Sequence, residues 1–161
     1  MSESVIDTML DAIVSFVQSN PLLVFAVLFF LYNKWQASQP WPDYGGRITS
    51  VHSVSEWDAL LADSKGKVVI VDAYATWCPP CKAAAPVYAR MSETFDPAGC
   101  TFAKFNTDEA KDLARKLGIT AMPTFLIFKD GTQVEAVRGF AGEAGLRSKL
   151  EAAGAVSVKK D

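Results

Sequence analysis

Two cysteines separated by two prolines are the residues of this chain best suited to chemistry. Cys78 and Cys81 lie in the run Trp77-Cys78-Pro79-Pro80-Cys81-Lys82. This spacing occurs in zinc sites, in covalent haem attachment and in redox-active disulfides. Zinc needs four ligands, and Cys100 and His52 are the only other cysteine and histidine in the sequence. Haem attachment needs a histidine where Lys82 stands. We therefore expect a redox pair, with no metal and no other cofactor.

The residues around the pair indicate which cysteine reacts first. The run Val68-Val69-Ile70-Val71 is typical of a strand buried on both faces. A helix is expected after the cysteines, with Pro86 kinking it and with an apolar face made by Ala84, Tyr88, Met91 and Phe95. A helix N-terminus stabilises a thiolate through its unpaired N–H groups and partial positive charge. We expect Cys78 to be the nucleophile and Cys81 the resolving thiol; the alternative is a passive pair of core cysteines.

The pattern after about residue 47 alternates strands with helices. Further strands are predicted over residues 48–51, 101–106, 124–128 and 133–138, and further helices around Trp57, over residues 110–117 and over residues 146–153. Ser55 and Asp58 resemble a capping box at the start of the first of these helices. Asp130-Gly131 predicts a tight hairpin between the last two strands. The expected fold is α/β, a mixed central sheet flanked by helices on both faces.

Residues 47–154 resemble a thioredoxin domain. The resemblance rests on five separated features in the right order: the active-site run from Val71 to Lys82, Pro86, the strand Ala103–Asp108, the run Met122-Pro123-Thr124, and the turn Lys129-Asp130-Gly131 followed by Gly139. The fold class that it implies is the thioredoxin-like fold, preceded in this chain by an N-terminal hydrophobic helix. The reaction that it implies is thiol–disulfide exchange through a mixed disulfide.

The resemblance also implies roles for single residues. Cys78 attacks a substrate disulfide, Cys81 then releases the reduced substrate, and Asp72 helps to take the proton from Cys81. A carboxyl group directly after a buried strand run is expected to be buried itself, which would raise its pKa into the range of a useful base. The alternative for Asp72 is a water-exposed position at the end of the strand.

Other residues are implied to support the site. Lys104 matches a lysine beside the carboxylate, although an ordinary surface lysine is the alternative. Pro123 is expected in cis, presenting the backbone of Met122 to the substrate, with Gly139 nearby. Trp77 is expected at the surface, shielding the thiols. Pro79-Pro80 departs from the commonest Gly-Pro of the family and removes one N–H near the Cys78 sulfur, while Cys100 is expected to be structural.

The N-terminal third is interpreted as a membrane anchor. We divide the chain into a hydrophobic segment at 1–32, a linker at 33–46 and the thioredoxin-like domain at 47–161. Residues 22–32 would rise only about 17 Å as a helix, whereas residues 13–32 would rise about 30 Å, enough for one span. Tyr32, Trp35 and Trp41 resemble interfacial aromatics. A helix packed on the domain or on a partner protein is the alternative.

Charge and composition limit the classes of partner and the location that we expect. Net charge is −2 and half of the residues are hydrophobic, which favours a packed core and disfavours nucleic acid as a partner. Lys34 and Arg47 follow the predicted span, and its N-terminal side has no basic residue. The domain is therefore expected on the cytoplasmic side of the membrane, with a lumenal orientation as the alternative.

The expected function is a membrane-anchored disulfide reductase. It would act on disulfide-containing proteins and be recharged by a thioredoxin reductase or by glutathione. Two alternatives remain open: a lumenal disulfide oxidase or isomerase, and a non-enzymatic adaptor that uses the fold only for binding.

Overall fold

The computed structural model describes residues 3–38 and 41–158. Residues 1–2 of the predicted hydrophobic segment, residues 39–40 of the predicted linker and residues 159–161 of the predicted domain lie outside the described residues. The chain divides into two units, Met1–Pro40 and Trp41–Asp161.

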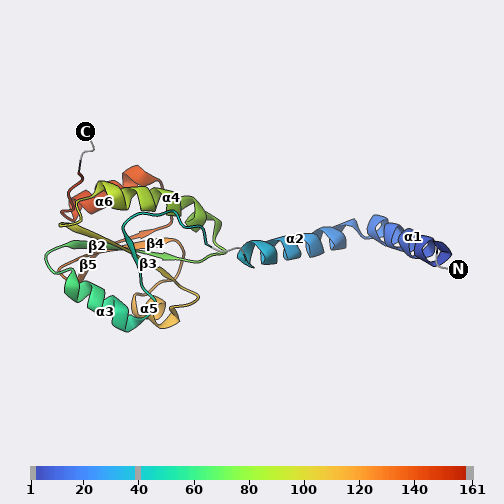
Figure 1. Ribbon diagram of the computed structural model, residues 1–161, viewed down its shortest axis with the longest axis horizontal. Coiled ribbons are helices and arrows are strands. Elements are labelled where there is room, and N and C mark those ends of the chain that lie inside the picture. Colours follow the sequence, from blue (N-terminus) through green and yellow to red (C-terminus); the bar gives the residue numbers. More distant parts are fainter. Residues whose placement is uncertain (1–2, 39–40, 159–161) are drawn as a thin grey trace. The chain divides into compact units, whose positions relative to one another are not determined.

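The second unit is built on a mixed sheet with the strand order β1-β3-β2-β4-β5 (Figure 1). β1 and β2 pair with β3 in parallel, whereas β4 is antiparallel to β2 and to β5. The strands are β1 (Ile48–Ser50), β2 (Val68–Tyr74), β3 (Cys100–Asn106), β4 (Thr124–Lys129) and β5 (Thr132–Arg138). The predicted mixed sheet is confirmed.

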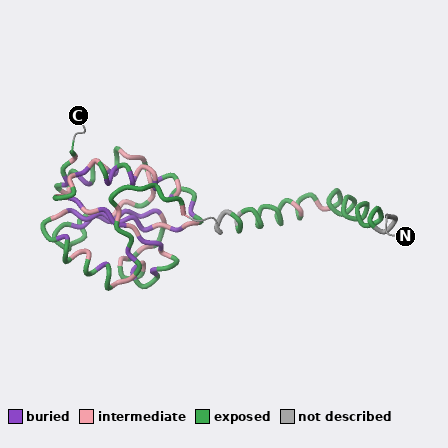
Figure 2. Tube along the Cα trace, in the orientation of Figure 1, coloured by how far each residue is buried: buried purple, intermediate pink, exposed green. Residues whose placement is uncertain are grey.

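Two helices cover each face of the sheet. In Figure 1, α4 (Pro79–Thr94) and α6 (Glu143–Ala152) lie on one side, and α3 (Val54–Asp63) and α5 (Lys111–Lys116) on the other. Successive residues of a strand point to opposite faces, so Ile70 packs with the α4 and α6 side chains and Val71 packs with those of α3 and α5. The central strands are therefore the most deeply buried part of the chain (Figure 2).

Two local details differ from the sequence expectations. β2 continues three residues beyond the run that ends at Val71, so Asp72 lies inside the strand and is only 3% exposed. α3 is capped by Ser53, whose Oγ accepts the Glu56 N–H at 3.2 Å, so the expected Ser55–Asp58 box is wrong. The expected and the observed capping residues are two positions apart in the sequence. The periodicity of a short helix does not define its first residue to within two positions.

The hairpin between β4 and β5 forms where the sequence predicts it. Asp130 and Gly131 both have positive φ, 50° and 77°. A two-residue turn of this kind matches the twist of the flanking strands, and asparagine, aspartate and glycine tolerate its backbone conformation best.

The first unit consists of two helices, α1 (Glu3–Ser19) and α2 (Pro21–Ser38). The expectation of one continuous helix over residues 13–32 is wrong, because the chain breaks at Asn20. Pro21 has no N–H to donate and its ring disfavours a helical residue before it, so it begins a new helix at the position proline tolerates best. α2 also continues to Ser38, six residues beyond the expected end of the hydrophobic segment at residue 32.

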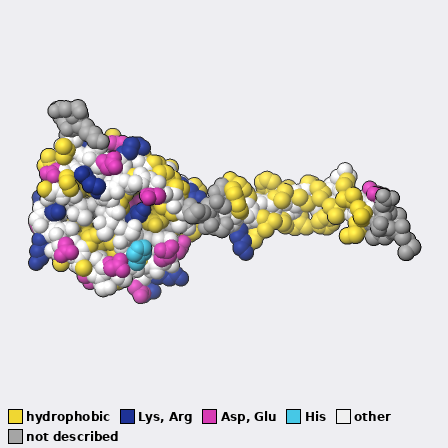
Figure 3. Space-filling model, in the orientation of Figure 1, with side chains coloured by type: hydrophobic (Ala, Val, Ile, Leu, Met, Phe, Trp, Pro, Cys, Tyr) yellow, Lys and Arg dark blue, Asp and Glu magenta, His cyan; other side chains and the backbone are white. Residues whose placement is uncertain are grey.

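Many large apolar side chains of this unit are exposed. Leu22 is 84% exposed and Phe25 is 68% exposed, and Figure 3 shows apolar side chains over much of the visible surface of α1 and α2. Among the described residues, neither helix taken singly has the length and apolar character needed to cross a membrane. The required length and apolar character are reached only by two segments taken together, Ile6–Ser19 and Pro21–Tyr32, and this pair is bent by 96°.

Candidate active site

The cysteine pair lies between the end of β2 and the start of α4. Cys78 is the residue that precedes α4, and Cys81 lies in its first turn. The two sulfur atoms are bonded in a disulfide, with the Cα atoms 5.3 Å apart. Both cysteines are buried, Cys78 with 3% of its surface exposed and Cys81 with none, so the order of the two thiols in the reaction stays a prediction. These two residues and Ala75 form a small buried cluster.

The two prolines leave one N–H group for the Cys78 sulfur. Pro79 and Pro80 occupy the first two helical positions, and neither has an N–H. The N–H of Cys81 donates to Cys78 Sγ at 3.3 Å, and the next one, from Lys82, donates to the Cys78 carbonyl oxygen. After reduction, the Cys81 N–H and the partial positive charge of the helix end are what stabilise a Cys78 thiolate.

Asp72 is a buried carboxyl group without a full set of partners. Its Oδ1 finds no hydrogen-bond partner in the described part of the chain. Burial raises the pKa of Asp72 from 3.8 to about 7, and the positive charge of Lys104 on the paired strand β3 opposes that rise. The water-exposed alternative for Asp72 is therefore wrong. A carboxyl group with such a pKa exchanges protons near neutral pH, which is the property of a general base.

Asp72 borders a cavity of about 10 Å³, the room needed by one water molecule. The walls include Tyr74 on β2, Lys104 on β3 and Tyr88 on α4. The hydroxyl of Tyr88 is already committed, because it donates towards two backbone oxygens of the sheet, at 2.8 and 2.9 Å. The cavity therefore offers the carboxyl group room for one water molecule, and the Tyr88 hydroxyl is not free to bind that water.

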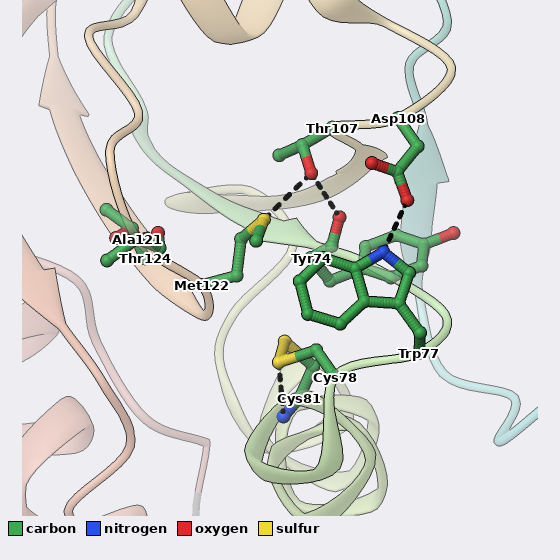
Figure 4. Close-up of a disulfide and its surroundings, with 9 residues drawn as sticks. All are labelled: Tyr74, Trp77, Cys78, Cys81, Thr107, Asp108, Ala121, Met122 and Thr124. Carbon is green, nitrogen blue, oxygen red and sulfur yellow. Dashed lines mark hydrogen bonds between the residues drawn. A yellow bond between two sulfur atoms is a disulfide. The ribbon is translucent and has the colours of Figure 1, made fainter. Parts of the chain in front are cut away.

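Trp77 and a neighbouring loop border the disulfide on the outside (Figure 4). Trp77 is half exposed, as expected, and its indole Nε1 donates to Asp108 Oδ2 at 2.8 Å. The Thr107 hydroxyl lies 2.9 Å from the Met122 sulfur and 3.2 Å from the Tyr74 carbonyl oxygen. Thr107 and Asp108 were not identified as site residues from the sequence, because they follow β3 in an ordinary turn and are brought to the cysteines only by the sheet.

The Met122–Pro123 peptide bond is cis, as expected. Pro123 is buried, its carbonyl oxygen accepts the N–H of Gly139 at 2.7 Å, and Met122 packs against the cysteine cluster. The structure therefore brings Met122, Pro123 and Gly139 together beside the disulfide.

Trp41 is part of the site, which the sequence did not indicate. Its ring contacts the ring of Tyr74 at 4.5 Å between centroids and packs against the cysteine cluster. The expectation that Trp41 is an interfacial aromatic of the anchor is therefore wrong. The pairing of Trp41 with Tyr74 joins residues 33 positions apart in sequence, and a local pattern contains no signal of it.

Cys100 packs in a different hydrophobic cluster from the cysteine pair. Cys100 is the first residue of β3, and burial raises the pKa of its thiol to about 12. Such a thiol is protonated at neutral pH and packs as an apolar residue. Within residues 3–38 and 41–158, no three side chains of His, Cys, Asp or Glu are gathered as a metal site would require.

The comparisons with known proteins agree with the geometry. The family model described as Thioredoxin matches residues 48–152. A Thioredoxin H-type of Oryza sativa subsp. indica is 43% identical over 96 residues, covering 58% of this chain and 77% of the relative. Thioredoxin-1 of Saccharomyces cerevisiae is 41% identical over 105 residues, covering 65% of this chain and 97% of the relative.

Solved structures of such proteins have the same fold. The crystal structure of thioredoxin NaTrxh from Nicotiana alata has a TM-score of 0.61 and 38% identity, over 67% of this chain and 93% of that one. The reduced thioredoxin pre-protein of Schistosoma mansoni has a TM-score of 0.61 and 36% identity, over 66% of this chain and 98% of that one. Residues 1–47 precede the part of the chain that the family model matches.

Proposed function

This chain belongs to the thioredoxin family, and we propose that it reduces disulfide bonds in proteins through Cys78 and Cys81. The observation that carries the proposal is the bond between the two sulfur atoms at the start of α4. This bond is the product that a dithiol leaves behind when it has reduced a substrate. The family's general reaction, thiol–disulfide exchange, fits it.

The first step is an attack by Cys78 on the substrate. The Cys78 thiolate attacks one sulfur of the substrate disulfide, and a mixed disulfide forms. The substrate bond breaks, and its second sulfur leaves with the electron pair and takes up a proton. The Cys81 N–H, which lies 3.3 Å from Cys78 Sγ, favours the attacking thiolate.

The second step returns the pair to the disulfide. Asp72 accepts the proton of Cys81, and the Cys81 thiolate attacks Cys78 Sγ. The mixed disulfide breaks, and the substrate sulfur leaves with the electron pair. Two electrons have then passed from the cysteine pair to the substrate. The raised pKa of Asp72, about 7, supports this role near neutral pH.

The surroundings of the disulfide support docking of an extended substrate segment. Met122 precedes the cis proline and packs on the cysteine cluster, so its backbone is a candidate for strand-like pairing with the substrate. Trp77, held by Asp108, would cover the thiols on the other side. Lys104 would moderate the charge of Asp72. The oxidised pair would be recharged by a thioredoxin reductase or by glutathione.

The proposal includes a membrane anchor at residues 13–32, with the catalytic unit on the cytoplasmic side. The exposed apolar side chains of α1 and α2 support an apolar environment around them. The break at Asn20 changes the form of the proposed anchor from one straight helix to two bent segments. The orientation rests on Lys34 and Arg47, which follow the apolar segment.

Insulin-disulfide reduction by the full chain tests the reaction. We expect turnover by the wild type, none by Cys78→Ser, and stable mixed disulfides with Cys81→Ser. Disulfide formation in a reduced substrate, without reduction of an oxidised one, would favour the oxidase or isomerase. A Cys78→Ser protein that keeps its cellular role would favour the adaptor.

Protease protection tests the anchor. Wild-type protein in sealed membranes should remain in the membrane fraction, with the catalytic unit digested from the cytoplasmic side. Recovery in the soluble fraction would refute the anchor. Membrane-bound protein that resists cytoplasmic protease would instead reverse the orientation.

A further inference from the structure

A short segment before β1 lies across α4 and over the cavity beside Asp72. We call residues 41–46 the strap. Its C-terminal end is fixed by Arg47, whose backbone N–H donates to Ser92 Oγ at 2.8 Å. The Arg47 guanidinium also donates to the carbonyl oxygens of Ser92 and Phe95 near the end of α4. These carbonyls have no partners within the helix, so Arg47 satisfies them and holds the strap on α4.

The strap approaches α4 very closely at Gly46. A Cβ atom at this position would lie 2.6 Å from Ser92 Oγ and 2.8 Å from the Ala89 carbonyl oxygen. Gly46 also has a positive φ, +85°, which glycine adopts without strain. Only glycine therefore fits where the strap crosses the helix. Gly45 offers a useful contrast, because its φ is +67° and a Cβ there would meet nothing within 4 Å.

The N-terminal end of the strap is held by its aromatic side chain alone among the described contacts. Trp41 lies on Tyr74, at 4.5 Å between ring centroids, and both rings pack against the cysteine cluster. Trp41, Tyr44 and Gly45 are also wall residues of the cavity beside Asp72. The inner walls come from the sheet and α4, so the strap supplies the outer wall.

We propose that Trp41 is a positioning residue for thiol–disulfide exchange: its ring closes the outer side of the cavity beside Asp72 and limits the exchange of water, and so of protons, between that carboxyl group and the solvent. The strap precedes residue 48, where the match to the family model begins. The proposal rests on the proposed function, because it assigns Asp72 to the proton transfer from Cys81.

Four other titratable side chains surround Asp72. Lys104 faces it from β3, Tyr88 from α4, Tyr74 from its own strand and Tyr44 from the strap. The pKa of Tyr88 is raised well above its ordinary value, first by burial and then by the charge of Asp72. The pKa of Tyr74 is raised by burial, Glu109 and Asp72. Neither tyrosine ionises near neutral pH. In the oxidised chain, where the Cys78 and Cys81 sulfurs are bonded to each other, a carboxyl titration near pH 7 therefore belongs to Asp72.

Two variants open the strap by independent routes. Trp41→Ala removes the outer wall, and Gly46→Ala forces the strap away from α4 without altering a wall residue. The experiment follows the side-chain carboxyl carbon of Asp72 by NMR in the oxidised full chain, in which the two cysteines do not titrate, with the signal assigned from Asp72→Asn. The rate of mixed-disulfide resolution is measured in parallel as a function of pH.

Both variants are expected to hydrate Asp72 and to lower its pKa from about 7 by about one unit or more. The pH midpoint of resolution should move in the same direction by the same amount. Trp41→Phe, which keeps an aromatic wall, should keep the wild-type midpoint. Gly66→Ala should keep it too, because it adds backbone strain at φ +80° without a clash and lies outside the cavity wall.

An Asp72 pKa that stays within a few tenths of the wild-type value in both opening variants would overturn the proposal. A fall that is equally large in Gly66→Ala would also overturn it, because backbone strain alone would then explain the effect. The proposed function fails in a different way, since all variants and the wild type would then lack insulin reduction while the carboxyl titration remains measurable.

Discussion

α2 and α4 are helices of similar length, 18 and 16 residues, that dispose of their apolar side chains in opposite ways. α4 buries one face against the sheet, with Tyr88 and Met91 almost inaccessible and Arg90 exposed between them. α2 has apolar side chains on every face, and most of them are exposed. A sheet covers only one face of a helix, so packing of the α4 kind would leave much of α2 in water.

The comparison teaches that hydrophobic content does not identify a core. A helix with apolar residues on one face can bury them against a protein surface. A helix with apolar residues on every face needs an apolar environment all around it. In this chain the arrangement separates the thioredoxin-like unit, which buries its own core, from α2, which is apolar on every face.

The largest expected effect comes from a substitution at the cysteine pair, which would show that the chemistry depends on the unit that contains α4 and not on the unit that contains α2. Cys78→Ser should lower insulin reduction by roughly three orders of magnitude or more, because the hydroxyl group is not ionised and cannot replace the thiolate. A matched change in the helical unit, Ser19→Ala, should leave the rate unchanged. Residual turnover of Cys78→Ser above a tenth of the wild-type rate would assign the reaction to another group.

The second prediction compares two phenylalanines. Phe125 is fully buried between Tyr88 and Phe140, so Phe125→Ala should lower the free energy of unfolding of the catalytic unit by about 3–5 kcal/mol. Phe25 on α2 is 68% exposed, and Phe25→Ala should change that free energy by less than about 0.5 kcal/mol. Urea unfolding followed by tryptophan fluorescence measures both. Equal losses would mean that the two units share one core.

The third prediction concerns the pH dependence of stability. Asp72 has a pKa of about 7 in the folded chain and an ordinary value of 3.8, so the folded state holds its proton more tightly. Its contribution is complete below about pH 4 and is lost as the pH rises through 7, at most about 4 kcal/mol in all. Asp72→Asn should remove this decline and stabilise the oxidised protein at pH 8, while slowing mixed-disulfide resolution at neutral pH.

Unfolding curves at pH 5 and pH 8 check the third prediction. Lys104→Gln sharpens it, because loss of the positive charge should raise the pKa of Asp72 further and steepen the decline. A wild-type stability that rises between pH 5 and pH 8 by an amount absent from Asp72→Asn would contradict the sign.

The smallest expected effect is that of removing residues 1–38. All the residues of the site lie beyond residue 40, so the shortened chain should reduce a small soluble disulfide within about twofold of the full chain. Reduction of a membrane-bound substrate should fall more, because tethering raises the local concentration. Equal losses for both substrates would mean that the helical unit contributes to the chemistry itself.

The sheet and the cysteine loop could be predicted because their signals are local. The run around Ile70 is too β-branched and too apolar for an exposed element, and Asp130-Gly131 suits few structures besides a tight turn. The cis bond before Pro123 and the proton-accepting role of Asp72 were predicted from the resemblance. The structure was needed to show which residues contact them.

The predictions from the sequence were wrong where contacts with distant residues, or the effect of a proline, determine the structure. Pro21 ends one helix and starts another, although the uncharged residues on both sides of it suit a single apolar span. Helix α2 continues to Ser38 because Lys34 and its polar neighbours have adequate helix propensity, whereas polarity alone had indicated a linker. Trp41 had no local sign of its role, since its partner Tyr74 is contributed by the centre of the sheet.

The two ends of the strap are attached in ways that respond differently to mechanical load. Arg47 makes three hydrogen bonds to Ser92 on α4 and a fourth to Phe95, directly after it, and these would be strained together. Trp41 is held by a ring contact on Tyr74. A pull along the chain from α2 reaches Trp41 first, because only residues 39–40 lie between them. Such a pull would peel the ring from the cysteine cluster while β1 stays anchored. Traction on the N-terminal helices is thereby directed to the side of the molecule where the thiols react.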